Sequence, residues 1–246
     1  MEDLHVSTIT AILQLSSDID LKQIFEEVPI STYIPFIEYG ETNGTKGFSK
    51  KLLKKKRKKK KKRIFYNQAT IHVNSYGKLM NVKLFNNGKI QITGLKQEGQ
   101  SVELVNELIL YLQYLDIFKE DVSIIHSQIV LINSDFDLGF KVNREMLHRE
   151  IINMGIYSSF EPCIYPGVNI KYYMNTNNSN GICCCNNICN GKGRANGDGD
   201  CKKVTIAVFM SGKTIITGGQ NKDQLKKCHQ FITNFIDERK EFFELK

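Results

Sequence analysis

The chain has 246 residues, a formal net charge of +8 and an ordinary hydrophobic content of 41%. This length suits one or two globular domains with a buried core. No apolar run approaches the roughly 18 residues that a membrane-spanning helix needs, and the start, MEDLHVSTIT, is acidic where a secretion signal would be basic. These features exclude a membrane-spanning protein and a secreted disulfide scaffold, so we expect a soluble intracellular protein.

In the first half of the chain, residue patterns predict a strand, a helix, an insertion, three strands and a long helix. In that order, they cover residues 5–15, 21–28, 36–63, 65–73, 78–86, 89–93 and 98–115. Asp18 or Asp20 can cap the first helix, which Pro29 ends. Asn87 and Gly88 are a strong tight-turn signal between the last two strands.

The second half repeats this order, and one hairpin occurs in both halves. It predicts a strand, a helix, a strand, an insertion, a hairpin and a helix, over residues 124–133, 143–153, 169–175, 176–201, 202–217 and 222–243. Residues 82–94 and 206–218 share Phe85/Phe209, Gly88/Gly212, Lys89/Lys213, Ile92/Ile216, Thr93/Thr217 and Gly94/Gly218, and Gln100 matches Gln224 at the same offset. We therefore predict a domain of about 120 residues duplicated in tandem, with repeats at 1–120 and 121–246.

The positive charge is concentrated in one tract. Residues 50–63 hold 12 of the 34 basic residues, which leaves 22 basic residues against 26 acidic ones elsewhere. So dense a tract repels itself and is typical of disorder when free. Attraction to phosphates and nuclear import are its candidate uses; the alternative is a low-complexity insertion from a lysine- and asparagine-rich coding background.

Five of the seven cysteines lie between residues 183 and 201. Without a secretion signal, a disulfide framework is not expected. A zinc site is conceivable because thiolates bind zinc well. The spacing fits poorly, since three cysteines are adjacent and paired C-x-x-C units are missing. We therefore expect a reduced, flexible loop, and neither a metal nor a cofactor.

The repeated hairpin has two distinct faces. Side chains alternate along a strand, so Val82 and Leu84 face one way while Lys83 and Phe85 face the other. The long helix of each repeat must cover one face. The other face presents phenylalanine and threonine twice, and an uncovered face of this kind is usually a binding surface. Alternatively, the two faces pack together as a sandwich and Phe85 and Phe209 are core aromatics.

Two segments resemble a known family. Residues 156–175, IYSSFEPCIYPGVNIKYYMN, followed by VTIAVFMSGKTIITGGQNKDQL, resemble the second repeat of the TATA-box-binding protein family. VSTIT and DIDLKQI resemble its first repeat more weakly. The resemblance covers nearly the whole chain, apart from insertions 36–63 and 176–201. It implies an α+β saddle, in which two pseudo-symmetric repeats form one curved antiparallel sheet with helices on the convex face.

The resemblance also implies DNA-binding residues. In this family aromatic side chains enter base steps from the minor groove and kink the duplex by about 80°, a value that belongs to the family. The matching positions are the aromatics Tyr165, Phe209, Phe85 and Tyr66 (with Phe65 as the neighbouring candidate), then Pro166, Thr93, Thr217, Val6, Val130, Ala207, Ile215, Lys89, Lys171 and Lys213. Glu161 lies in the loop with which the family docks a TFIIB-like factor.

Several positions depart from the family pattern. Leu4 and Gln128 stand where the family has central asparagines, and Lys83 and Gln91 replace apolar groove residues of the first repeat. Gln128 and Lys83 remain candidate DNA contacts, because Lys83 could reach a phosphate or a base edge. The tyrosine at 165, like that at 66, adds a hydroxyl that must stay hydrated. These departures predict relaxed selectivity for TATA sequences and asymmetric binding.

The leading functional hypothesis is a non-enzymatic, TATA-box-binding-protein-like general transcription initiation factor. It would bind and bend double-stranded A·T-rich DNA as a monomer, with a TFIIB-like factor and the RNA polymerase machinery as partners and without a membrane. Similar insertions in large DNA viruses and AT-rich protists place it in the nucleus, or in a viral factory or host cytoplasm if it is viral. The alternatives are a scaffold that has lost DNA binding, and an enzyme; for the latter the chain has no room for a catalytic domain.

Overall fold

The computed structural model describes residues 4–42, 44–49, 65–176, 178–186, 188–193 and 200–245, so the basic tract 50–63 lies outside the described residues. The strands are β1 (His5–Leu15), β2 (Phe36–Tyr39), β3 (Gly44–Gly47), β4 (Gln68–Ser75), β5 (Lys78–Phe85), β6 (Lys89–Leu95), β7 (Ile124–Asp137), β8 (Tyr157–Glu161), β9 (Tyr165–Met174), β10 (Lys202–Val208) and β11 (Lys213–Gly219). The helices are α1 (Leu21–Glu27), α3 (Gln100–Tyr114), α4 (Arg144–Asn153), α5 (Lys222–Asp237) and α6 (Lys240–Phe243). Within these described ranges, none of the helices combines the length and apolar character needed to cross a membrane.

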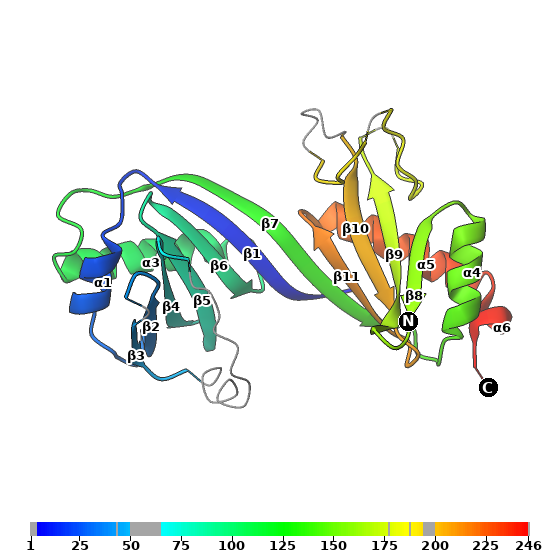
Figure 1. Ribbon diagram of the computed structural model, residues 1–246, viewed down its shortest axis with the longest axis horizontal. Helices are drawn as coiled ribbons and strands as arrows, with labels where there is room; N and C mark the ends of the chain where they lie inside the picture. The colour runs from blue at the N-terminus through cyan, green and yellow to red at the C-terminus, as the bar shows by residue number, and fades with distance from the viewer. Residues whose placement is uncertain are drawn as a thin grey trace. The chain divides into compact units, whose positions relative to one another are not determined.

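The strands form one 11-stranded antiparallel sheet in the order β3-β2-β4-β5-β6-β1-β7-β11-β10-β9-β8 (Figure 1). The chain divides into two compact units, residues 8–130 and residues 1–7 with 131–246. We call them the first unit and the second unit. Strands β1 and β7 each begin in one unit and end in the other, so each unit contains a piece of both strands.

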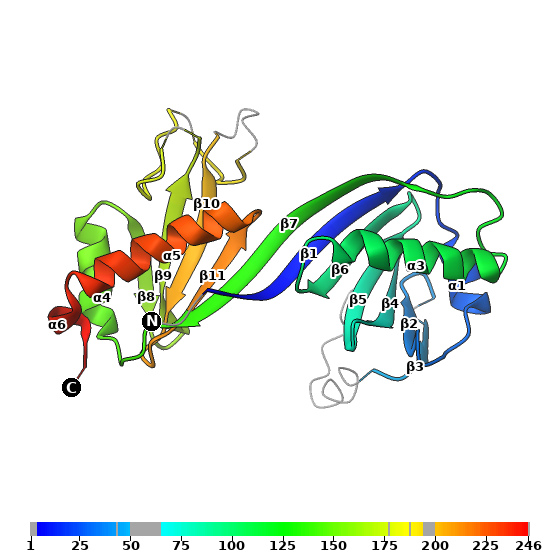
Figure 2. The same cartoon turned by 180° about the vertical axis from the view of Figure 1, so that it is seen from behind.

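In the first unit, α3 covers one face of the sheet (Figure 2). Met80, Val82 and Leu84 of β5 alternate toward that side and are buried. Leu104 and Leu108 of α3 are buried with them. Each fully buried side chain of this kind contributes roughly 1.5–3 kcal/mol, so this alternation fixes which face of the strands is left open.

In the second unit, α5 crosses one face of β9, β10 and β11 (Figure 2). Two ring contacts connect sheet and helix: Phe136 to His229 with centroids 4.5 Å apart, and Tyr172 to Phe231 at 4.7 Å. The single helix predicted over 222–243 is wrong, because the chain leaves helical geometry at Arg239 (φ −133°) before α6. Phe243 of α6 then packs against Phe235 of α5, with ring centroids 5.6 Å apart.

Two other predictions about elements are corrected by the structure. Residues 36–63 do not start as an insertion, because β2 lies within the sheet beside β4 and buries Phe36, Ile37 and Tyr39. Strand β8 was not predicted at all. Its alternation is weak, because only Ser158 of its five residues is buried.

The repeated hairpin turns explain part of the sequence repeat. Gly88 and Gly212 have φ of +74° and +88°, a conformation that favours glycine. Their backbone N–H groups donate to the carbonyl oxygens of Phe85 and Phe209 at 3.1 Å and 3.0 Å. A Cβ atom on either glycine would lie 2.4 Å from a backbone carbonyl oxygen. The two hairpins therefore need glycine for the same geometric reason.

Candidate functional site

In the part of the chain that the structure describes, each unit leaves the sheet face opposite its long helix open, and equivalent strands place equivalent residues there. In the first unit the register aligns one row of side chains across β4, β5, β6 and β1: Thr70, Lys83, Gln91 and Ile12. In the second unit the corresponding row across β9, β10, β11 and β7 is Asn169, Ala207, Ile215 and Asp135. We call these the middle rows. They combine the predicted residues with unpredicted neighbours.

Both repeated phenylalanines lie on these open faces. Phe85 and Phe209 are half-buried, whereas their strand neighbours Leu84 and Val208 are fully buried on the helix side. The alternative that the phenylalanines are core aromatics sealed beneath a helix is therefore wrong. Their rings are available at the surface of each unit.

Tyr165 and Phe209 form an aromatic pair at the end of the open face of the second unit. Their ring centroids are 5.7 Å apart, with planes at 61°, an edge-to-face geometry that aromatic rings favour. Gly167 lies beside them, and a Cβ atom there would be 2.9 Å from Tyr165 and 3.2 Å from Phe209. Any larger residue at 167 would therefore press on both rings, a role of this glycine that sequence reasoning missed. Pro166 is exposed and its carbonyl oxygen accepts from Arg144.

The first unit holds its aromatic residues differently. Gln68 pairs with Phe85 and is buried, with its amide Nε2 donating to Thr70 Oγ1 at 2.9 Å. Tyr66 is 69% exposed and its hydroxyl donates to Glu41 Oε1 at 2.8 Å. This hydrogen bond raises the pKa of Tyr66, and that of Glu41 is lowered by its bonds from Tyr39 and Tyr66. Phe65 lies before β4, which begins three residues later than predicted.

The two predicted threonines occupy equivalent positions and both have a hydroxyl or amide partner. Thr217 Oγ1 donates to Asn133 Oδ1 at 2.6 Å, and Thr93 Oγ1 lies 3.3 Å from Thr10 Oγ1. Asn133 and Thr10 were not predicted, because a partner on a distant strand leaves no local sequence signal. These bonds hold each threonine side chain on the open face.

The predicted lysines lie at three kinds of position. Lys89 and Lys213 are exposed at the starts of β6 and β11. Lys171 Nζ donates to Thr205 Oγ1 at 3.0 Å, and burial together with the positive charge of Lys203 lowers its pKa. Lys83 is half-buried within the middle row of the first unit.

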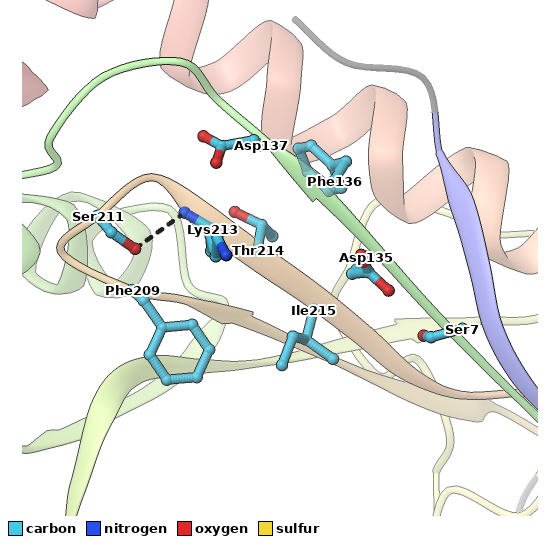
Figure 3. A pocket seen from close by; sticks show the side chains of 9 residues that line it. All are labelled: Ser7, Asp135, Phe136, Asp137, Phe209, Ser211, Lys213, Thr214 and Ile215. Atoms are coloured by element: carbon cyan, nitrogen blue, oxygen red, sulfur yellow. Dashed lines mark hydrogen bonds between the residues drawn. The ribbon is translucent and has the colours of Figure 1, made fainter.

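Two acidic residues of β7 lie on the open face of the second unit and were not predicted. Asp137 pairs with Lys213 and Asp135 with Ile215. Both line a hollow of ≈ 720 Å³, together with Phe209 (Figure 3). Their carboxylates oppose the approach of phosphates to this part of the face. The strand predicted over 124–133 ended too early to reveal them.

The remaining predicted residues are all at the surface. Val6, Val130 and Leu4 are half-exposed and Gln128 is exposed. Glu161 is exposed at the end of β8, where the N–H of Ile164 donates to its carbonyl oxygen at 2.9 Å. Ile164 is 85% exposed in this turn. The turn therefore presents an apolar side chain and a carboxylate to solvent.

The structure corrects the argument from cysteine spacing. Adjacent side chains do diverge, but the sulfur atoms of Cys183 and Cys185, on either side of Cys184, gather with those of Cys189 and Cys201. Contacts between the loop and the ends of β9 and β10 bring them together, and these contacts are not visible in the spacing.

Two comparisons relate the chain to known proteins, while no protein-family model matches it. A "TATA-box-binding protein-like" protein of Acanthamoeba polyphaga mimivirus is 28% identical over 248 residues, which cover 94% of this chain and 64% of that protein. This chain thus spans less than two thirds of the mimivirus protein. The structure of the TATA-box-binding protein (TBP) of Methanococcus jannaschii matches with a TM-score of 0.58 and 16% identity, over 96% of this chain and 99% of that one.

Proposed function

Because the chain is a TATA-box-binding-protein-like protein with the α+β fold of that family, we propose that it is a general transcription initiation factor that binds and bends A·T-rich promoter DNA through the minor groove. The fold is that of non-enzymatic proteins, so the prediction that the chain is not an enzyme is confirmed. The observation that carries the proposal is the open face of the second unit, with the aromatic pair Tyr165 and Phe209 at its end.

The chemistry of that face suits a minor groove. Ile215, 37% exposed, gives it an apolar centre beside the buried Ala207, and Thr217 adds a hydroxyl near them. The minor groove offers a degenerate hydrogen-bond pattern, and G·C pairs add an amino group to its floor. An apolar face therefore favours A·T pairs, which lack that group. Phe209 and Tyr165 would wedge into a base step, and Lys213 would contact a phosphate near the kink.

We further propose that the turn after β8 docks a TFIIB-like factor, which would bring in the RNA polymerase machinery. Glu161 supplies an exposed carboxylate and Ile164 an exposed apolar side chain in one turn, so a basic partner surface with an apolar centre would fit. By this proposal the protein acts as a monomer on DNA, in the nucleus or, if viral, in the viral factory or host cytoplasm.

A bending assay tests the proposal. Full-length protein is mixed with end-labelled duplexes of matched length, A·T-rich and G·C-rich, and bending is followed by energy transfer between the ends. We expect a bent complex on A·T-rich DNA. Phe209→Ala should weaken it roughly 5- to 150-fold, because stacking of a base on an aromatic ring contributes about 1–3 kcal/mol.

The matched control is Phe242→Ala, which removes an exposed phenylalanine of α6 and should leave bending unchanged. Equal losses in both variants, or unbent DNA with the unmodified protein, would contradict the proposal.

A second candidate function is a protein-interaction scaffold that has lost sequence-specific DNA binding. The polar pair Lys83 and Gln91 in the first unit and the carboxylates of Asp135 and Asp137 in the second favour it, because they make both faces less suited to a minor groove. A scaffold would bind neither the A·T-rich nor the G·C-rich duplex, yet it would still bind a TFIIB-like factor. The variant Glu161→Lys, which reverses the charge at the turn, should abolish that binding.

A further inference from the structure

Four cysteine side chains converge beside the ends of β9 and β10, away from the predicted DNA-binding residues of the open face. The sulfur atoms of Cys183, Cys185, Cys189 and Cys201 all lie within 4.8 Å of one another. Cys201 is buried and the other three are half-buried. This cluster, which we call the thiol cluster, has no part in the proposed DNA binding.

The spacing of the sulfur atoms fits a tetrahedral metal site. Four thiolates around zinc, each with a Zn–S bond of about 2.3 Å, place neighbouring sulfur atoms about 3.8 Å apart. The sulfur atoms of Cys185 and Cys201 are 3.4 Å apart, and all pairs of the cluster are within 4.8 Å. Shifts of about 1 Å or less would complete the tetrahedron. Four sulfur ligands in this geometry select zinc or iron over calcium, magnesium or copper(II).

The fold brings the four ligands together from two directions. Cys201 directly precedes β10, while Cys183, Cys185 and Cys189 come from the connection that follows β9. Two isolated bridges fasten this connection to the strand ends, Tyr173 with Gly181 and Lys192 with Lys202. The first bridge precedes Cys183 and the second follows Cys189, so the three cysteines between them are held at both ends.

The surroundings of the sulfur atoms suit thiolates. The amide Nδ2 of Asn175 lies 3.7 Å from Cys201 Sγ. Donors of this kind orient metal-bound thiolates and stabilise their charge.

The charges of neighbouring residues are also suitable. Zinc with four thiolates carries a net charge of −2. Lys192, Lys202 and Lys203 belong to the backbone segments that hold the cluster, and their positive charges would partly balance it. The carboxylate Oδ1 of Asp200 is the opposing group, at 3.3 Å from Cys185 Sγ.

From this geometry we propose that the thiol cluster is a structural zinc site with the spacing C-x-C-x3-C-x11-C. Each thiol releases its proton to solvent as its Zn–S bond forms. All four positions are taken by protein ligands, which is the closed arrangement of structural sites. The bound ion closes the long connection between β9 and β10 into short loops and so stabilises the edge of the second unit.

Metal analysis of the full chain tests the proposal. The protein is purified under reducing conditions, dialysed, and its zinc content measured by mass spectrometry. Cobalt(II) is then substituted, because its visible spectrum reports tetrahedral thiolate ligation. We expect one tightly bound zinc ion and the cobalt spectrum of a four-thiolate site. Cys189→Ser should weaken zinc binding more than about 100-fold, since even residues behind the ligands contribute 10- to 100-fold.

The neighbouring Cys184 is the matched control. It is exposed and lies outside the cluster, although its sulfur is 3.9 Å from that of Cys201. Cys184→Ser should keep both the zinc and the cobalt spectrum. Cys189→Ser changes a half-buried position, and circular dichroism of the metal-free protein checks that the rest of the chain stays folded.

Four results would overturn the proposal: reduced protein that takes up neither metal, equal loss in Cys184→Ser and Cys189→Ser, iron in place of zinc, or a disulfide between Cys185 and Cys201 in the reduced preparation. Chelation should also expose the connection to trypsin at Lys192 and Lys202. Unchanged cleavage after zinc removal would contradict the structural role.

Discussion

The middle rows of the two units show how far a duplicated surface can diverge on an unchanged backbone. Lys83 on β5 pairs with Gln91 on the adjacent strand β6 in the first unit. At the equivalent positions of the second unit, Ala207 on β10 pairs with Ile215 on β11. The hairpin turns that join these strands, and the threonines Thr93 and Thr217 that follow them, are the same in both units. Geometry is therefore shared between the repeats, while the central pair of the row is polar and charged in the first unit and apolar in the second.

The aromatic ends of the two faces differ in the same way. Gly167 leaves room beside the rings of Tyr165 and Phe209, whereas the equivalent Gln68 of the first unit is buried with its amide bonded to Thr70, and Tyr66 is bonded to Glu41. The aromatic pair of the second unit is thus already in contact, whereas the hydroxyl of Tyr66 in the first unit is engaged by Glu41.

Among the substitutions that compare the two units, the largest effect is expected from making the first middle row resemble the second. The double substitution Lys83→Ala with Gln91→Ile should raise the preference for A·T-rich over G·C-rich DNA by roughly tenfold, since a mismatched base pair usually costs about 1–3 kcal/mol. Competition gel shifts with the two duplexes measure this ratio. Lys22→Ala, on exposed α1, controls for the lost charge, and an unchanged ratio would show that the row does not contact the groove.

A smaller effect is expected from the lysines after the two turns. Lys89→Ala and Lys213→Ala should each reduce the slope of log affinity against log salt by about 0.9, because each removes one phosphate contact. Titrations at several salt concentrations give the slopes. Lys226→Ala, exposed on α5, should not change the slope. If only Lys213→Ala changed the slope, the second unit alone would contact phosphates through this lysine, and the two units would differ in this contact as well.

The smallest effect concerns stability. Thr217→Val removes the 2.6 Å bond to Asn133 and should lower the free energy of unfolding by about 1 kcal/mol. Thr93→Val removes the longer contact with Thr10 and should cost less. Urea denaturation followed by circular dichroism measures both values. A larger loss of stability for Thr93→Val than for Thr217→Val would show that the shorter hydrogen bond is not the more stabilising one.

Local patterns allowed much of the fold to be predicted. Strand β1, the hairpins and the amphipathic helices follow from periodicity, and Asp20 caps α1 by accepting from the N–H of Gln23. Strands β2 and β8 were missed because each is short and gains its place by pairing with a longer neighbour. For the candidate site, alternation placed Phe85 and Phe209 on the open face.

The unpredicted parts of the sites depend on contacts between distant segments. The position of Asp135 beside Ile215 follows from the register of β7 against β11, and that of Cys201 beside Cys185 from the path of the connecting loop. Neither register nor loop path is encoded in a short window of residues. The role of Gly167 could have been suspected from the Tyr-Pro-Gly sequence that it ends.

The passage of β1 and β7 from one unit into the other limits how the protein can change in evolution. One residue added at Ser7 or at Val130, where the chain changes units, would reverse the alternation of side chains on one side of the addition only. Core residues of one unit would then turn outward while those of the other stayed in place. Length can thus be gained between strands, as in the connection from β9 to β10, whereas a single residue added to either crossing strand would need a β-bulge to restore the alternation.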